Sequence, residues 1–242
     1  MIDLLMSHTS VRKYKDVPIP KETVEELVKA GQHAASSHFV QSYSIIYVTD
    51  EKKKEQLAEL SKNPRQILGA GAVLLFCSDY RRLEKAAAMH DTTIDFGYAE
   101  NTLVGAIDVA LCAQNVAIAA ESKGYGICYI GGARNAPTEI SDLFDLPKGV
   151  MPLFAMTIGV PDQDHEVKPR LPIDAVLHEN SYDETRYDTL LPEYDQTMEE
   201  YYNKRSSNRK ISSWSKQMAD FLGTPQRTFM KDALKRQGYD NK

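Results

Sequence analysis

Several features that define other protein classes are scarce or absent in this sequence. Its 242 residues include only three cysteines, Cys77, Cys112 and Cys128, and no CxxC pair. A zinc site needs cysteine or histidine ligands at short spacing, so the sequence gives no support for a bound metal. Each cysteine lies in an apolar run, and we therefore expect three buried free thiols. Unpaired thiols in odd number are typical of the reducing cytoplasm, which is the location we expect.

Other signatures are also missing. No GxGxxG motif opens a helix after a predicted strand, which argues against a Rossmann unit. The formal net charge is −5, which disfavours a general nucleic-acid-binding surface. The first residues, MIDLLMSHTSVRKYK, lack the charged start and long apolar run of a signal peptide. The longest apolar stretch, residues 99–120, contains Glu100 and Asp108, so we do not expect a membrane span.

The apolar periodicity predicts strands that alternate unevenly with helices. Amphipathic spacing predicts helices that begin at Pro20 and after Asp50, which is expected to act as a cap. Asn135 is expected to cap a short helix that ends near Leu143. Runs of β-branched and aromatic residues predict strands over residues 43–49, 72–78, 125–130 and 152–160. The pattern favours a mixed sheet covered by helices.

The longest helical pattern covers residues 99–122. Two apolar stripes follow it, and small residues fill much of the remainder. A helix that is apolar on two faces is buried from two sides, so we expect it to form the spine of the core or of a dimer interface. One stripe contains Leu103, Ile107, Ala110 and Ala117, and the other contains Val104, Leu111 and Ile118.

The chain from Tyr187 onward is helical in pattern, polar and strongly charged. It has too little apolar content to fold alone. We therefore divide the single domain into a core, residues 1–186, and a C-terminal helical arm, residues 187–242, that wraps a second subunit. Trp214, the only tryptophan, is expected to anchor the arm by packing.

Two basic segments are candidate anion sites. In the first, His8, Thr9, Ser10 and Arg12 follow a short predicted helix, and their imidazole, hydroxyl and guanidinium groups can all donate to phosphate. In the second, residues 168–170, a proline separates a lysine from an arginine and stiffens the backbone between them. A solvated loop and an exposed turn are the respective alternatives.

Two glycines follow the strand predicted over residues 125–130. Gly131 and Gly132 would let the backbone approach a flat ligand closely, although a plain strand-ending turn fits the same residues. A further basic run, residues 201–210, could bind a nucleotide phosphate or be solvated. None of these segments contains an acid–base pair or an activated nucleophile, so no residue is assigned a catalytic role.

Taken in order, these segments resemble the nitroreductase superfamily, and within it the NfsA/FRP type of oxygen-insensitive, NADPH-dependent nitroreductases and flavin reductases. The resemblance covers nearly the whole chain, and the ordered set is far more specific than any one piece. It runs through SHTSVRKY, VQSYSIIYVTD, LFCSDYRR, LVGAIDVALCAQNVAIAAESKGYGICYIGGARN, PLFAMTIGVP, KPRLP and HENSY.

The resemblance implies the α+β nitroreductase fold, with a central mixed, mainly antiparallel sheet flanked by helices. It implies a homodimer that holds FMN at its interface and has the C-terminal arm around the partner. In the implied activity, NADPH delivers hydride to flavin N5, and nitroaromatics, quinones or free flavin then take up the electrons in the same pocket, which gives ping-pong kinetics. Small aromatic oxidants are thus the expected partners, and we expect the protein to bind neither nucleic acid nor a membrane.

The resemblance also implies roles for single residues. Arg12 matches the basic residue beside the pyrimidine edge of the flavin. Arg205 matches the residue that grips the 2′-phosphate of NADPH, and Arg227 matches a cation near the substrate pocket. The other expected FMN contacts are His8, Thr9, Ser10, Lys168 and Arg170 around the phosphate, Ser37 and Gln41 along the ribityl chain and ring, and Tyr129, Ile130, Gly131 and Gly132 at the strand end.

Three features depart from the family pattern. Thr9 stands where the family has a second basic residue, the serine-rich loop at residues 35–38 is one residue shorter and contains His38, and one flavin contact is changed. The family's Asn-Gln pair is Asn63-Pro64 here, and because proline cannot replace a side-chain amide, Gln66 is the expected substitute. Two alternatives to the implied activity are a flavin-fold reductase with another acceptor and a non-enzymatic or regulatory FMN-binding protein.

Overall fold

The computed structural model describes residues 1–163, 166–204, 212–240 and 242. By their contacts the residues form two compact units, one of residues 1–165 with 229–242 and the other of residues 166–228. The last residues of the chain therefore belong with the first unit rather than with the helices that precede them. The expected division into residues 1–186 and 187–242 stays a prediction.

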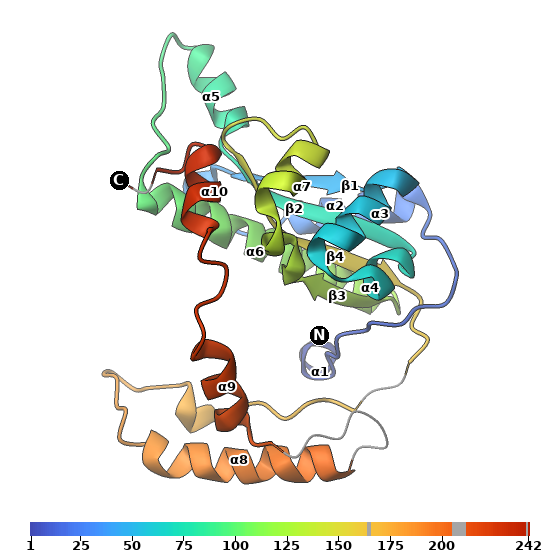
Figure 1. The fold of residues 1–242 in the computed structure, drawn as a ribbon, viewed down its shortest axis with the longest axis vertical. Helices are drawn as coiled ribbons and strands as arrows, with labels where there is room; N and C mark the ends of the chain where they lie inside the picture. Colours follow the sequence, from blue (N-terminus) through green and yellow to red (C-terminus); the bar gives the residue numbers. More distant parts are fainter. Residues whose placement is uncertain (164–165, 205–211, 241) are drawn as a thin grey trace. The chain divides into compact units, whose positions relative to one another are not determined.

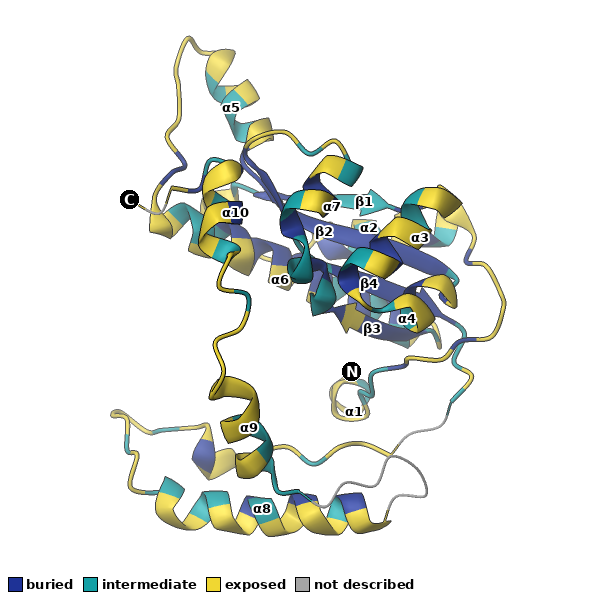
Figure 2. Ribbon diagram, viewed as in Figure 1, coloured by how far each residue is buried: buried dark blue, intermediate teal, exposed yellow. Residues whose placement is uncertain are grey.

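The first unit is built on a four-stranded sheet with the order β1-β2-β4-β3 (Figure 1). All three strand pairings are antiparallel. Every residue of the central strand β2 is buried, as its continuous apolar run predicts for a strand covered on both faces (Figure 2). The strands are β1 (Tyr43–Tyr47), β2 (Ala72–Asp79), β3 (Gly126–Ile130) and β4 (Val150–Gly159). The strands expected from the sequence are confirmed within a few residues.

Helices cover both faces of the sheet. On β2, Val73, Leu75 and Cys77 pack among α3, α4 and α7, whereas Leu74 and Phe76 pack among α2 and α6. This alternation follows from the two-residue period of a strand. The covering helices are α2 (Lys21–Gln32), α3 (Glu51–Ser61), α4 (Pro64–Leu68), α6 (Ala99–Ser122) and α7 (Pro137–Leu143); the other helices of this unit are α1 (Ile2–Met6), α5 (Arg81–Ala88) and α10 (Met230–Arg236). The α+β fold class is confirmed.

One of the two expected helix caps is confirmed. The Asp50 carboxylate accepts a hydrogen bond from the backbone N–H of Lys53 at 2.9 Å and caps α3. The expected cap at Asn135 is wrong. The residue before α7 is Ala136, which makes no side-chain cap, and the Asn135 amide instead donates to the Ser61 carbonyl at 3.0 Å. The reason is that residues 131–135 form their own short helix, η2 (Gly131–Asn135).

Helix α6 has the bounds that the sequence predicts, and one of its faces is buried in the core. Cys112 and Val116 are fully buried on that face. The opposite face is open within this chain, because Leu103, Ile107 and Leu111 are 59%, 54% and 41% exposed. The helix is also long and apolar enough to cross a membrane, with a mean hydropathy of 1.8, but a core helix passes the same test.

The residues that follow α10 complete an aromatic cluster of the first unit. Tyr239 is 1% exposed, and its ring contacts Tyr80 and Phe96. Its hydroxyl donates to the Gly149 carbonyl at 3.0 Å and lies 2.9 Å from the Ser78 hydroxyl. A buried tyrosine needs such partners, and this one fixes the end of the chain against the sheet.

The second unit is formed by α8 (Tyr187–Lys204), α9 (Trp214–Leu222) and the short helix η3 (Ile173–Ala175). Along α8, Tyr194, Met198 and Tyr202 form a buried stripe at helical spacing, and the rest of the helix is largely exposed (Figure 2). The ring of Trp214 lies 5.7 Å from that of Tyr194, edge to face. The expected packing role of Trp214 is confirmed.

Candidate functional site

The first basic segment is fixed to the edge strand β3 by close backbone contact. The backbone N–H of Val11 donates to the Ile127 carbonyl at 2.9 Å, and the Tyr14 hydroxyl donates to the Val11 carbonyl at 2.7 Å. Gly126 permits this approach, since a Cβ there would lie 2.4 Å from Cγ2 of Val11. The segment that carries the candidate phosphate ligands is therefore an ordered part of the sheet edge.

The side chains of this segment present several hydrogen-bond donors. The His8 ring Nδ1 lies 2.5 Å from Oε1 of Glu121, at the C-terminal end of α6. Among the described residues, the hydroxyls of Thr9 and Ser10 bond to no other group. Arg12 is exposed and contacts the Ser10 carbonyl at 3.3 Å. Two half-buried hydroxyls and a guanidinium are thus open to a ligand.

The end of β3 lies close to the start of α4. A Cβ on Gly132 would lie 2.2 Å from both the Ser61 carbonyl oxygen and Nδ2 of Asn63, so only glycine fits there. On the same strand, the Tyr129 hydroxyl donates to the Gln114 side chain at 3.2 Å, and burial raises the pKa of that phenol well above its ordinary value. Tyr129 therefore stays a hydrogen-bond donor at neutral pH.

Proline at position 64 has a structural role in this chain. Pro64 is the first residue of α4 and Asn63 precedes it as N-cap residue, a position at which proline's missing N–H costs nothing. Gln66 lies on the same short helix, half-buried, and its amide makes no hydrogen bond to any other described residue. The expectation that Gln66 replaces the missing flavin contact stays a prediction.

A second group of candidate residues lies in the loop of residues 36–42. The carboxylate of Asp108, a fully buried residue of α6, accepts four hydrogen bonds from this loop. The donors are the Ser36 hydroxyl at 2.7 Å, the Ser37 N–H at 3.0 Å, and the N–H and hydroxyl of Ser42, both at 3.1 Å. One carboxylate therefore joins the two ends of the loop.

Between those two ends the backbone is strained. His38, Phe39 and Gln41 have φ values of 46°, 60° and 50°, in the left-handed region that non-glycine residues avoid. Each such residue costs about 1–3 kcal/mol and persists only where surrounding contacts impose it. The backbone N–H of Gln41 also donates to the Ser36 hydroxyl at 2.7 Å, inside the loop. Such strain is concentrated at ligand-binding sites.

The sheet order keeps these two groups of candidate residues apart. The loop of residues 36–42 leads into β1, and Gly131 and Gly132 follow β3, which lies at the opposite edge of the sheet. Three strand spacings of about 4.8 Å separate those edges by about 14 Å. The structure brings residues 8–12 to β3, but it does not bring Ser37 and Gln41 to the same place.

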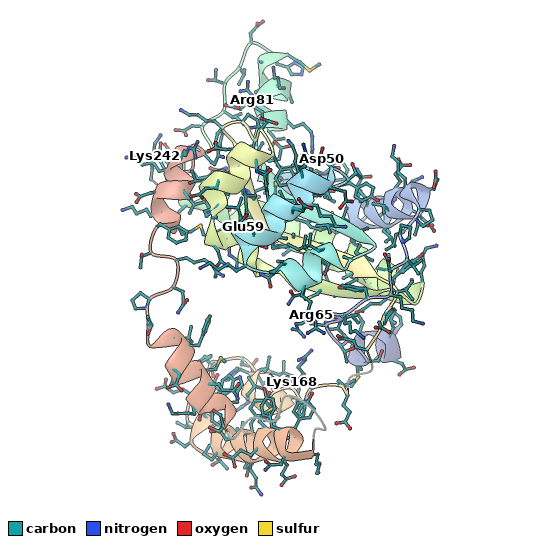
Figure 3. All side chains as sticks on the ribbon, turned by 45° about the vertical axis from the view of Figure 1, so that its right-hand side comes forward. Asp50, Glu59, Arg65, Arg81, Lys168 and Lys242 are labelled. Atoms are coloured by element: carbon teal, nitrogen blue, oxygen red, sulfur yellow. The ribbon has the colours of Figure 1, made fainter. Side chains whose placement is uncertain are left out.

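The second basic segment lies in the second unit, against α8. The Tyr194 hydroxyl donates to the Pro169 carbonyl at 2.9 Å. The ammonium of Lys168, which is labelled in Figure 3, lies 5.5 Å from the centre of the Tyr202 ring. Neither Lys168 nor Arg170 forms an ion pair with a carboxylate in the part of the chain that the structure describes. Two cations without an acidic partner suit an anionic ligand.

The remaining candidates concern NADPH. Arg205 lies outside the described residues, as do Arg209 and Lys210 of the same basic run. Arg227 is described, half-buried, with a φ of 48° that is unusual for a non-glycine residue. Its assignment to the substrate pocket stays a prediction.

All three cysteines are buried and unpaired, as expected. Burial raises the pKa of the Cys112 thiol to about 11 and also raises the pKa values of Cys77 and Cys128. The protonated thiol is a poor nucleophile, so none of the three is suited to covalent catalysis.

Sequence reasoning missed the residues that hold the candidates in place. Asp108 is the clearest case, and its signal was present: it is the only charged residue in the apolar middle of the helix, residues 103–113. Glu121, which pairs with His8, gave no comparable signal. Tyr194 and Tyr202 could be seen only as apolar positions of the arm, not as contacts of residues 168–170.

Comparison with protein families gives two matches. The model described as Nitroreductase family matches residues 5–160, and the one described as Nitroreductase family, C-terminal domain, matches residues 168–242. A Cr(VI) reductase of Pseudomonas sp. (strain G-1) is 57% identical over 238 residues, with 98% of each chain covered. An NADPH-dependent oxidoreductase of Staphylococcus aureus (strain MSSA476) is 42% identical over 243 residues, covering 98% of this chain and 96% of the relative.

Solved structures agree in fold over the full length. NfrA1 of B. megaterium superposes with a TM-score of 0.95 at 38% identity, covering 99% of this chain and 98% of that one. The NADPH:FMN oxidoreductase from Vibrio harveyi, solved in complex with NAD+, gives a TM-score of 0.90 at 37% identity, covering 100% and 99%. With family matches across both units and relatives well above 30% identity, the chain belongs to the nitroreductase family.

Proposed function

We propose that this protein is an FMN-dependent NADPH oxidoreductase that acts as a homodimer. Its relatives are named NADPH-dependent oxidoreductase, Cr(VI) reductase and NADPH:FMN oxidoreductase, and they align over nearly the whole chain. FMN is the bound cofactor and NADPH the co-substrate.

The available donors fit the phosphate and ring of FMN. The hydroxyls of Thr9 and Ser10 have no competing partner among the described residues, and Lys168 and Arg170 have no acidic partner there. Hydroxyls and cations together are the groups that bind a phosphomonoester in proteins. Gly132 lets the end of β3 pack closely against Ser61 and Asn63, and its role as a flavin contact rests on the family resemblance.

The observation that carries the dimer is the distribution of candidate residues over the sheet. Ser37 and Gln41 lie at the β1 edge, whereas residues 8–12 and Gly131 lie at the β3 edge. The fold of one chain does not bring these two groups together, and a second copy can supply the missing group. The exposed apolar face of α6, with Leu103, Ile107 and Leu111, offers the surface for that copy.

When bound, FMN accepts hydride from NADPH and passes two electrons to the acceptor. The chain itself would bind and orient the cofactor: Thr9 and Ser10, with Arg170 as the family resemblance implies, would hold the phosphate, and Arg12 would place positive charge beside the pyrimidine edge of the ring. No protein acid or base is required, which agrees with the absence of a candidate dyad in the sequence.

The acceptor belongs to a broad class of small oxidants. Nitroaromatics, quinones, free flavin and, from the relative with 57% identity, Cr(VI) are the compounds to compare. The three buried, unpaired thiols favour a cytoplasmic location.

The decisive experiment begins with purified protein. We expect a yellow dimer with one FMN per chain that oxidises NADPH only when an acceptor is present. A colourless monomer that takes up no added FMN would refute the assignment, and a yellow dimer that oxidises no NADPH with any acceptor of the panel would point to a non-enzymatic flavin-binding protein.

The preference for NADPH has its own test at Arg205. The overall charge of −5 repels the 2′-phosphate, so the preference requires a local cation. Arg205→Ala should raise KM for NADPH by roughly 10-fold or more and leave NADH kinetics nearly unchanged. Equal use of both nucleotides by the unmodified protein, or equal loss of both in the variant, would remove Arg205 from this role.

A further inference from the structure

The strained loop of residues 36–42 is held from inside the protein by a single residue. Asp108 has no exposed surface, and its two carboxylate oxygens accept four hydrogen bonds, all from this loop. In the part of the chain that the structure describes, no cation lies within ion-pair distance of it. A buried carboxylate is costly to desolvate unless its acceptor positions are filled, so the loop and Asp108 depend on each other.

The four bonds are placed where they determine the shape of the loop. Two come from residues 36 and 37 at its start and two from Ser42 at its end. Between them lie the three residues with positive φ, His38, Phe39 and Gln41. Without restraint, these non-glycine residues would leave the left-handed region. The strained backbone persists because both ends of the loop are bonded to the Asp108 carboxylate.

An outer contact supports the loop more weakly. The exposed side chain of Arg82 donates to the Gln41 carbonyl at 3.2 Å and to the Tyr43 carbonyl at 3.1 Å. Exposed contacts contribute less than buried ones because water competes for the same groups. The hydrogen bonds to Asp108 therefore stabilise the loop more than the hydrogen bonds from Arg82 do.

We propose that Asp108 is a positioning residue for cofactor binding: its buried carboxylate ties together the two ends of the loop of residues 36–42 and holds Ser37 and Gln41 in the strained conformation that receives FMN. Asp108 itself touches no ligand. This inference rests on the proposed function, because it takes Ser37 and Gln41 as FMN contacts.

The central test is the FMN dissociation constant of the Asp108→Asn apoprotein, measured by quenching of flavin fluorescence. Asparagine keeps the size but turns one acceptor into a donor that faces the loop's own donors. The dissociation constant should rise at least about 10-fold, the equivalent of one lost charged hydrogen bond. In Asp108→Asn the backbone amides of Ser37 and Ser42 should exchange hydrogen faster than in the unmodified protein, under conditions in which the rest of the protein stays folded.

A matched control separates positioning from general destabilisation. Val116→Ala truncates a fully buried side chain of the same helix, away from the loop, and should lower the free energy of unfolding without raising the FMN dissociation constant. If Asp108→Asn does not fold, Ser36→Ala and Ser42→Ala each remove one hydroxyl bond to the carboxylate and should each weaken FMN binding, by more than Arg82→Ala does.

Rescue by glycine tests the strain directly. Glycine adopts positive φ without penalty, and His38 is not among the expected flavin contacts. Alone, His38→Gly should leave the FMN dissociation constant within about 2-fold of that of the unmodified protein. Combined with Asp108→Asn, it should lower the dissociation constant at least about 3-fold relative to Asp108→Asn alone, because a glycine needs less restraint to keep positive φ.

The outcomes distinguish this inference from the proposed function. If the unmodified apoprotein binds no FMN, the proposed function fails and the inference fails with it. If the unmodified protein binds FMN and Asp108→Asn binds it equally well, or loses affinity only as much as Val116→Ala does, the inference alone is overturned. Loss of affinity with rescue by glycine supports it.

Discussion

The contact between Gly126 and Val11 gives a sharp test of how the sheet edge supports cofactor binding. A Cβ at position 126 would lie 2.4, 2.6 and 2.9 Å from Cγ2, Cβ and Cγ1 of Val11. Ordinary carbon contacts begin near 3.5 Å, so in Gly126→Ala the two residues must move apart by roughly 1.1 Å. Val11 cannot move alone, because its N–H bonds to Ile127 and its carbonyl bonds to Tyr14.

The expected magnitude follows from these restraints. Overpacking of a buried contact costs about 1–3 kcal/mol, and loss of the bond between Val11 and Ile127 adds about 1 kcal/mol. We therefore expect Gly126→Ala to lower the free energy of unfolding by about 2–4 kcal/mol, measured by urea denaturation of the apoprotein. The FMN dissociation constant should also rise, since Ser10 and Arg12 flank Val11.

A double-mutant cycle provides the refutation. Val11→Gly removes all three contacting atoms, so the combined variant should be more stable than the sum of the two single effects predicts, by at least about 1 kcal/mol. Additive effects would show that the two residues do not clash. An unchanged stability and FMN affinity in Gly126→Ala would contradict the steric argument as a whole.

Two further predictions concern charged residues of the cofactor site. Arg170→Ala should weaken FMN binding by roughly 10- to 150-fold, the value of one charge-assisted hydrogen bond, and an unchanged dissociation constant would place Arg170 outside the site. Arg12→Gln should lower the midpoint potential of bound FMN by about 20–40 mV, because a fixed cation favours the reduced ring by about 1–2 kcal/mol, and a potentiometric titration without a shift would remove Arg12 from that role.

The strands and the main helix could be predicted because their signals are local. The apolar run that forms β2 is covered on both faces, and α6 begins and ends at the residues that its pattern predicts. Helix α5 (Arg81–Ala88) was not expected, because it is short, none of its residues is fully buried, and Leu83 is its only large apolar residue in contact with the core. Asn135 misled because the cap position before α7 lies one residue later, at Ala136.

The candidate site was predictable only in pieces. The segments at residues 8–12, 131–132 and 168–170 each contain a recognisable set of donors or glycines. Their separation depends on the strand order β1-β2-β4-β3, which no local pattern encodes. Asp108 was visible as an acid in an apolar helix, but its partners lie near residue 40, and only the tertiary structure brings the loop to it.

The burial of Tyr239 beside Ser78 and Gly149 has a consequence for how this chain is made. Tyr239 belongs to the first unit, yet residues 166–228 lie between it and β4, so the ribosome must deliver the whole second unit before the aromatic cluster can close. The contact joins residues 161 positions apart, so it can form only when nearly the whole chain has been made. A gene shortened after β4 to produce the first unit alone would yield a nascent core that never acquires its last aromatic partner.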